Sequence, residues 1–207
     1  MIGIGPHGVF VDANVLYSRT LRDWLGLLYT IPDVPPFQVF WTEDVLAETI
    51  YHLRRSHLDW SGGRLSAIRD RIAGTFEAGR VADFPIDAGW SGQDPNDAHV
   101  HSAARACQAD ILLTADTGDF DDDSAPYSVY SPDDFFTLVD DSSPGLVREA
   151  TASEVRYWLG RGREPHLPQS LRVAACPVFA ERVRCHLLAL DRNSTLFGGQ
   201  DPPSDGR

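Results

Sequence analysis

Short apolar segments alternate with longer segments of helical periodicity through the first 139 residues, and this alternation constrains the fold more than any other feature of the sequence. Four segments are short and rich in aliphatic or aromatic residues, as buried strands are: 8–11, 37–41, 110–114 and 127–130. Strands that alternate with helices form a parallel sheet covered by helices on both faces. We therefore predict an α/β fold with a central parallel sheet.

Helical segments separate the predicted strands. They occupy residues 15–29, 43–57, 60–78, 94–107 and 133–139. Two of these helices begin at residues that commonly cap helices. Thr42 precedes the helix 43–57, which has acidic residues in its first turn. Ser131, followed by Pro132, precedes the helix 133–139. Residues 81–86 form either a short strand or an extended lead-in to the next helix.

The sequence changes character after residue 139. We predict one domain of residues 1–139, followed by a helical extension of residues 140–192 that packs on it and is interrupted near Pro177. The tail of residues 193–207 is rich in Gly, Pro, Asp and Ser, a composition that favours disorder.

Three features exclude whole classes of protein. No apolar stretch approaches the roughly 18 residues that a membrane span requires. The N-terminus lacks the basic and long apolar regions of a secretory signal. The three cysteines are an odd number without a CxxC pair, so neither a disulfide framework nor a zinc site is expected. We expect a cytoplasmic protein without a membrane partner.

Acidic residues stand beside the predicted strand ends. Asp12 ends the first strand, and Asp116 directly follows the third. Glu48 lies in the helix after the second strand, and Asp97 lies near the start of the fourth helix. Each of these acids alone is also explained as a helix cap, a solvated side chain or half of an ion pair. Their order in the fold, however, lets all four reach one end of the sheet, where ligands of such folds bind.

Carboxylates brought together raise one another's pKa steeply unless a counter-charge is present. A divalent cation supplies that charge, and oxygen ligands without histidine or thiolate select magnesium or manganese. Such ions activate water and clamp phosphodiester oxygens, so the chemistry indicated is hydrolysis of a phosphodiester by water. A phosphatase or dehalogenase with Asp12 as nucleophile would need a second aspartate two residues on and a later lysine; position 14 is Asn14, and the chain has no lysine.

The overall charge argues against non-specific binding of nucleic acid, because such binding depends on cationic groups that displace counterions. The formal net charge is −12, with 30 acidic residues against 18 arginines. Bound cations would reverse the sign of the charge at a carboxylate site. Arg54 and Arg55, beside the Glu48 helix, form a candidate RNA-contacting rim, although an ordinary solvated helix face explains them equally well.

Four short motifs resemble those of the PIN-domain family, and within it the VapC-type toxin ribonucleases. They are residues 9–16 (VFVDANVL), 46–49 (LAET), 97–104 (DAHVHSAA) and 113–120 (LTADTGDF). The resemblance covers roughly residues 8–139. It implies a three-layer α/β/α sandwich, here with a C-terminal helical extension.

The resemblance also implies a function. Asp12, Glu48, Asp97 and Asp116 would be the catalytic acids, with Asp12, Asp97 and Asp116 holding magnesium or manganese. The implied activity is that of an endoribonuclease, and many relatives are toxins of a toxin–antitoxin pair whose antitoxin protein covers the active site. A homodimer is implied by resemblance only. The alternative is a catalytically silent PIN fold that binds RNA or proteins.

Several positions stay open or depart from the family pattern. Many such toxins carry asparagine at the position of Asp116, and Asp119 stands at the later acidic position of the same motif. Either Asp116 or Asp119 could therefore contact the metal directly. Asp94 is either a further ligand or a helix cap before Pro95, and Asn14 is a further polar candidate in the first motif. At helical spacing, His101 falls one turn after Asp97 and is a candidate base, whereas His99 is expected to point elsewhere.

Overall fold

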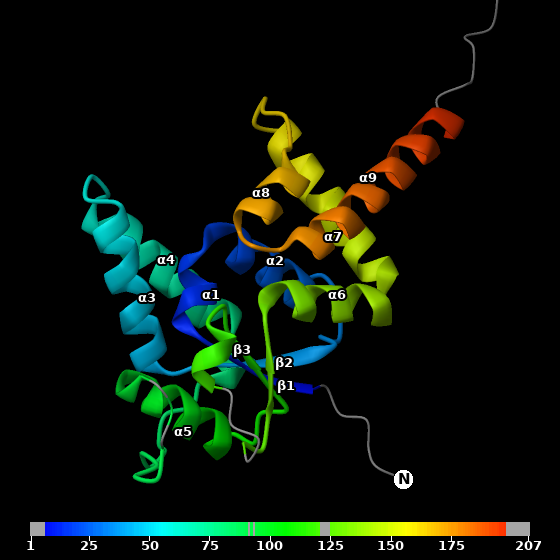
Figure 1. Ribbon diagram of the computed structural model, residues 1–207. Helices are drawn as coiled ribbons and strands as arrows, with labels where there is room; N and C mark the ends of the chain where they lie inside the picture. Colours follow the sequence, from blue (N-terminus) through cyan, green and yellow to red (C-terminus); the bar gives the residue numbers. More distant parts are fainter. Residues whose placement is uncertain (1–6, 91, 93, 121–124, 198–207) are drawn as a thin grey trace, which may run out of the picture.

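A computed structural model describes residues 7–90, 92, 94–120 and 125–197 (Figure 1). The strands are β1 (His7–Val11), β2 (Phe37–Phe40), β3 (Ile111–Leu113) and β4 (Ser128–Tyr130). All of them pair in parallel, in the order β2-β1-β3-β4. The predicted α/β/α fold with a parallel sheet and further C-terminal helices is confirmed.

Helices make up most of the remaining described chain. They are α1 (Ala13–Tyr17), α2 (Arg19–Thr30), α3 (Glu43–Ser56), α4 (Gly62–Thr75), α5 (Ala98–Ala106), α6 (Pro132–Ser142), α7 (Pro144–Leu159), α8 (Leu167–Val173) and α9 (Pro177–Phe197), with short 3-10 turns η1 (Glu77–Gly79), η2 (Pro95–Asp97) and η3 (Thr117–Phe120). None of these helices is both long enough and apolar enough to cross a membrane.

Strand β1 lies in the middle of the sheet, and its residues Val9, Phe10 and Val11 are completely buried. Burial on both faces explains why this strand is apolar at consecutive positions rather than alternating. Val11 is in register with Leu113, and the Asp12 amide donates to the Leu113 carbonyl oxygen at 3.0 Å. The carboxyl ends of β1 and β3 therefore lie side by side.

The helix caps follow the sequence signals. The Thr42 hydroxyl accepts from the Val45 amide at 3.2 Å, and the Ser131 hydroxyl accepts from the Asp134 amide at 3.1 Å. Residues 81–86 form no strand, although the Val81 amide donates to the Trp41 carbonyl.

One predicted helix and one predicted boundary differ from the structure. Residues 15–29 were expected to form one helix, but the chain breaks at Ser18, which is extended and caps α2 through the Leu21 amide. The interruption predicted near Pro177 is confirmed, as a turn in which Ala175 has φ +59° and which separates α8 from α9. Helix α9 extends to Phe197, past the expected start of the tail at residue 193, and residues 198–207 lie outside the described part of the chain.

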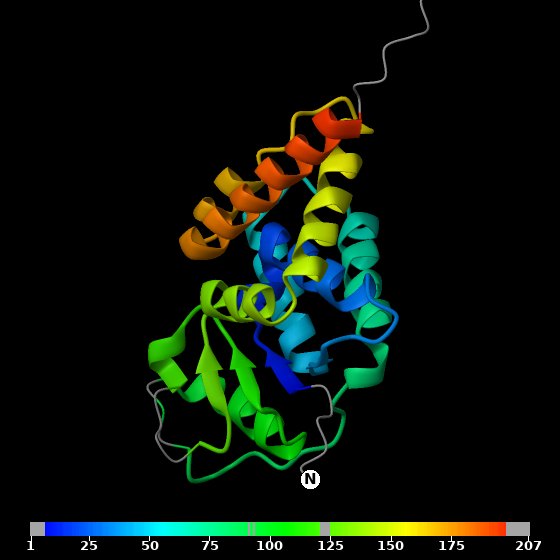
Figure 2. The same cartoon turned by 90° about the vertical axis from the view of Figure 1, so that its right-hand side faces the viewer.

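The C-terminal helices pack on the end of the molecule toward which the strands point (Figure 2). Phe179 of α9 contacts Trp24 of α2 edge-on, with ring centroids 5.0 Å apart, and lies 5.2 Å from Phe136 of α6. The Asp133 carboxylate accepts from the amides of Val178 and Phe179 and so caps α9 from another helix. Apolar packing and this cap together fix α9 against α2 and α6.

Candidate functional site

Asp12 is held rigidly at the end of β1. The side chain is 7% exposed, and one carboxylate oxygen accepts from the Ala13 amide at 2.6 Å as the cap of α1. The other oxygen accepts from Asn14 Nδ2 and from Thr114 Oγ1, both at 2.8 Å. Burial raises the pKa of Asp12 above its ordinary value, and the hydrogen bonds from Thr114 and Ala13 oppose that rise.

Asn14 joins the ends of β1 and β3. Its amide nitrogen lies 2.8 Å from Asp12 Oδ2, 2.9 Å from Thr114 Oγ1 and 3.2 Å from Asp116 Oδ2, and its amide oxygen accepts from the Ala115 backbone at 3.0 Å. Asp116, which is exposed, is thereby linked to Asp12 through a single side chain. The structure thus brings together three of the residues that the sequence singled out.

Sequence reasoning gave no role to Thr114. This buried hydroxyl donates to Asp12, and it also accepts from the Asp116 backbone amide at 3.1 Å. The signal that could have revealed it is a polar residue directly after the apolar run of β3, at the sheet edge where the acids were expected.

Glu48 approaches the same region from α3. His52, one turn further along α3, has Nε2 3.4 Å from Glu48 Oε1, and His99 of α5 has Nε2 4.0 Å from Glu48 Oε2. The negative charge of Glu48 contributes to the raised pKa of both Asp12 and Asp97. Glu48 therefore lies within electrostatic reach of two acids from other elements.

Asp97 carries the strongest electrostatic signal in the site. Partial burial, followed by the nearby charges of Asp12, Asp94, Asp119 and Glu48, raises its pKa from 3.8 to about 7. Among the residues that the structure describes, no cationic side chain lies within ion-pair distance of this carboxylate.

The remaining acidic candidates lie around Asp97. Asp94 accepts from both the backbone amide and the side-chain amide of Asn96 at 2.8 Å, so it caps the turn η2. Asp119 is half-buried and contributes to the raised pKa of Asp97, whereas Asp116 is the acid that contacts Asn14.

The expected directions of the two histidines on α5 were wrong. His99 faces Glu48, whereas His101 is buried and lies 2.6 Å from the Tyr127 hydroxyl, stacked on Trp90. The reason is that Asp97 belongs to the 3-10 turn η2, and α5 begins only at Ala98, so ideal helical spacing does not apply across this junction.

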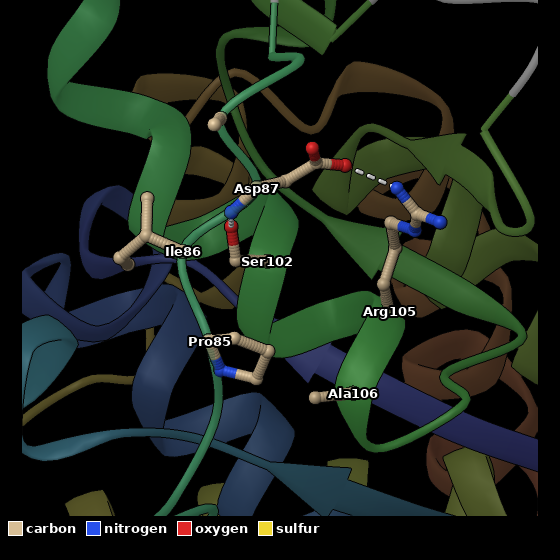
Figure 3. A pocket seen from close by; sticks show the side chains of 7 residues that line it. Pro85, Ile86, Asp87, Ser102, Arg105 and Ala106 are labelled. Atoms are coloured by element: carbon tan, nitrogen blue, oxygen red, sulfur yellow. Dashed lines mark hydrogen bonds and ion pairs between the residues drawn. The ribbon is translucent and has the colours of Figure 1, made fainter.

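The contacts of His101 continue into a surface hollow beside α5, shown in Figure 3. There Asp87 is ion-paired with Arg105, and its backbone amide donates to Ser102 Oγ at 2.8 Å. His101 Nε2 also lies 3.7 Å from the Asp87 carboxylate. These contacts hold the segment before η2 against α5 and engage both ring nitrogens of His101.

Arg54 and Arg55 have local partners on the α3–α4 side. Arg54 donates to the Trp60 carbonyl at 2.6 Å, and Arg55 donates to the Tyr51 hydroxyl at 3.2 Å. An RNA-contacting role for either residue stays a prediction.

The donor chemistry of this region fits a hydrated hard cation. Across the described residues, no three His, Cys, Asp or Glu side chains converge closely enough to hold an ion by themselves. Magnesium, however, usually keeps several waters and is bound through only one or two carboxylates. The raised pKa values of Asp12 and Asp97 mark the place where a positive charge would relieve electrostatic repulsion.

The raised pKa of Asp97 predicts how the stability of the metal-free protein depends on pH. Below about pH 4 the carboxyl is protonated in both the folded and the unfolded state, whereas above pH 7 only the folded state bears the cost of an ionised, half-buried carboxylate. Stability should therefore fall as pH rises between these values. We expect Asp97→Asn, in EDTA near pH 8, to raise the free energy of unfolding by about 1 kcal/mol, because solvent screens most of the full shift.

Urea unfolding near pH 8 and near pH 4 measures this effect, with Asp70→Asn as a matched control on the exposed face of α4. The variant should gain stability only at the higher pH, and the control at neither. An Asp97→Asn protein less stable than the wild type near pH 8 would contradict the electrostatic account.

Comparison with known proteins gives one family. The family model described as the PIN domain matches residues 8–118, more than half of the 207 residues. No curated protein and no solved structure matches the chain significantly. The matched range includes Asp12, Asn14, Glu48, Asp97 and Asp116.

Proposed function

The chain belongs to the PIN-domain family, and on this basis we propose that it is a divalent-metal-dependent endoribonuclease that hydrolyses RNA phosphodiester bonds. PIN domains are generally metal-dependent nucleases. The observation that carries the proposal for this chain is the pKa of Asp97, raised to about 7 among acids that come from separate elements of the fold. A cluster of uncompensated carboxylates at the carboxyl ends of β1 and β3 is costly unless it holds a cation.

In this proposal, Asp12, Asp97 and Asp116 would hold magnesium or manganese, with Glu48 as the fourth catalytic acid. The chemistry that such an ion supplies when bound is a lowered pKa of a water molecule and neutralisation of charge on the phosphodiester oxygens. Asn14 and Thr114 keep Asp12 in one orientation, and Asn14 holds Asp116 beside it. His52 and His99 flank Glu48 and limit the directions that its carboxylate can take.

The test is cleavage of a mixed pool of structured RNA by the purified protein in manganese, in magnesium and in EDTA. We expect cleavage with either metal, none in EDTA, and recovery when metal is restored in excess. Cleavage that persists in EDTA would overturn the metal requirement. Absence of cleavage under all three conditions would favour the alternative, a silent PIN fold that binds RNA or proteins.

We propose further that this ribonuclease acts in the cytoplasm as the toxin of a toxin–antitoxin pair and as a homodimer. The support is the resemblance of its motifs to VapC-type toxins, many of which are inhibited by an antitoxin segment that covers the active site. A small reading frame immediately upstream should encode the inhibitor. Its purified product should block RNA cleavage; a product that leaves cleavage unchanged would contradict the pairing, and light scattering tests the dimer.

A further inference from the structure

A half-open groove of about 520 Å³ lies between α2, α4 and α7. Figures 1 and 2 show that α4 and α7 stand on either side of α2 at this place. Four arginines line the groove: Arg19, Arg22, Arg64 and Arg71. Two acids, Asp23 and Glu154, also line it, so its formal charge is +2 in a protein whose net charge is −12. The charge of the groove is thus opposite in sign to the net charge of the protein.

Two of these arginines, Arg64 and Arg71, are free to bind an anionic ligand, whereas the half-buried Arg22 already donates to backbone carbonyl oxygens. Among the described residues, no carboxylate lies within ion-pair distance of Arg22, Arg64 or Arg71; Arg19 has its Nε 3.3 Å from Asp23. Arg64 and Arg71 are exposed and lie two turns apart on α4. Two unpaired guanidinium groups along one helix suit successive phosphates, which arginine binds with paired hydrogen bonds.

Aromatic rings stand among the arginines. Trp60 is stacked on His57 with ring centroids 3.7 Å apart, and the guanidinium carbon of Arg64 lies 3.7 Å from the centre of its ring. Tyr157 of α7 is 44% exposed and also lines the groove. Trp60 is half-buried, and His57 and Arg64 cover its two faces, so the exposed ring of the groove is that of Tyr157. An exposed ring beside arginines is a combination on which single-stranded nucleic acid binds, because a base stacks on the ring while phosphates contact the cations.

The groove begins close to the carboxylates. Arg22 donates to the carbonyl oxygens of Leu16 and Tyr17, the last residues of α1. Asp12 caps the opposite end of this helix, whose five residues span about 7 Å. A single RNA strand is long enough to occupy both places at once.

We propose that the groove between α2, α4 and α7 binds the phosphate backbone of single-stranded RNA next to the bond that is cleaved. The inference rests on the proposed ribonuclease function and gives that site a substrate-binding surface. One wall of the groove is α7, which lies beyond the residues 8–118 that the family model matches. The C-terminal helices therefore contribute directly to RNA binding. An acidic segment of a partner protein is the competing occupant, but it would make no comparable use of the exposed Tyr157 ring.

The test measures the affinity for a fluorescently labelled single-stranded RNA of mixed sequence, by anisotropy, in EDTA so that no cleavage occurs. The variant is Arg64→Ala/Arg71→Ala, and the matched control is Arg69→Ala/Arg148→Ala, which removes the same charge from exposed positions of α4 and α7 outside the groove. We expect the groove variant to bind about tenfold more weakly, and the slope of log affinity against log salt to fall by about 1.4, or about 0.7 for each lost phosphate contact. The control should lose less than about twofold.

Equal loss of affinity in the groove variant and the control would overturn the proposal, because overall charge would then explain binding. Unchanged affinity of the groove variant would also overturn it and would leave an acidic protein segment as the occupant. Displacement of the RNA by micromolar AMP would overturn it as well, since the groove would then be a mononucleotide site. Thermal unfolding of each variant establishes that the fold is intact.

This experiment is separate from the test of catalysis. A protein that binds RNA through the groove but never cleaves it would retain this inference and lose the proposed function. If the protein cleaves RNA with metal but its groove variant binds RNA normally, the proposed function is retained and this inference is lost.

Discussion

The Asp97→Asn variant is expected to cleave RNA on the order of a thousandfold more slowly than the wild type, in magnesium or in manganese. Asparagine has nearly the same shape as aspartate but no negative charge, so the variant loses the most electrostatically stressed carboxylate of the proposed metal site. Single-turnover cleavage of a defined RNA measures the loss. Asp70→Asn, an exposed acid paired with Arg69 on α4, is the control and should cleave at the wild-type rate.

The same substitution is expected to stabilise the metal-free protein, which separates chemistry from folding. A variant that is inactive because it unfolds would melt below the wild type, whereas Asp97→Asn in EDTA near pH 8 should melt above it. Cleavage by Asp97→Asn within about tenfold of the wild-type rate would show that Asp97 is not a catalytic acid, and Asp116 or Asp119 would become the stronger candidate.

The Phe179→Ala variant is expected to lose about 3–5 kcal/mol of stability, which corresponds to a fall of roughly 10 °C in Tm for a chain of this size. Phe179 is completely buried, and its ring joins Trp24 of α2 to Phe136 of α6. Its removal leaves a cavity at the place where the C-terminal helices meet the α/β body. Calorimetry in a single heating scan measures both the size of the loss and the number of transitions.

Val178→Ala is the matched control, because the neighbouring Val178 is 53% exposed and should cost less than about 1 kcal/mol. A Phe179→Ala protein that behaves like this control would contradict our proposal that residues 140–192 pack on the domain as one cooperative unit with it. Two separate transitions in the wild type would contradict it independently.

The parallel sheet could be predicted from local sequence signals. Strands β1 and β3 are apolar at consecutive positions because helices cover both faces of the sheet, and this pattern is visible without coordinates. Caps such as Thr42 and Ser131 act within one helical turn, so their positions were also readable. The break at Ser18 was missed because the apolar periodicity continues across it, while the hydroxyl starts a new helix.

The acids of the candidate site were predicted from a similar local signal, since Asp12 and Asp116 follow strands and parallel strands end at a common edge. Sequence spacing failed at the two histidines, because the chain enters α5 through a 3-10 turn and the ideal helical angle between Asp97 and His99 is lost. The participation of Thr114 was likewise visible only once β1 and β3 were paired.

The sequence by itself determined the order of strands and helices, the family, and which carboxylates stand at strand ends, because periodicity, caps and motifs are properties of neighbouring residues. Only the tertiary structure decided which residues, distant in the chain, these side chains contact. Asn14 contacts Thr114 across 100 positions, Asp133 caps α9 from 46 positions away, and the arginine groove is assembled from three helices that are distant in the chain. Such contacts depend on how whole elements pack, and packing is a sum over many side chains that no local pattern contains.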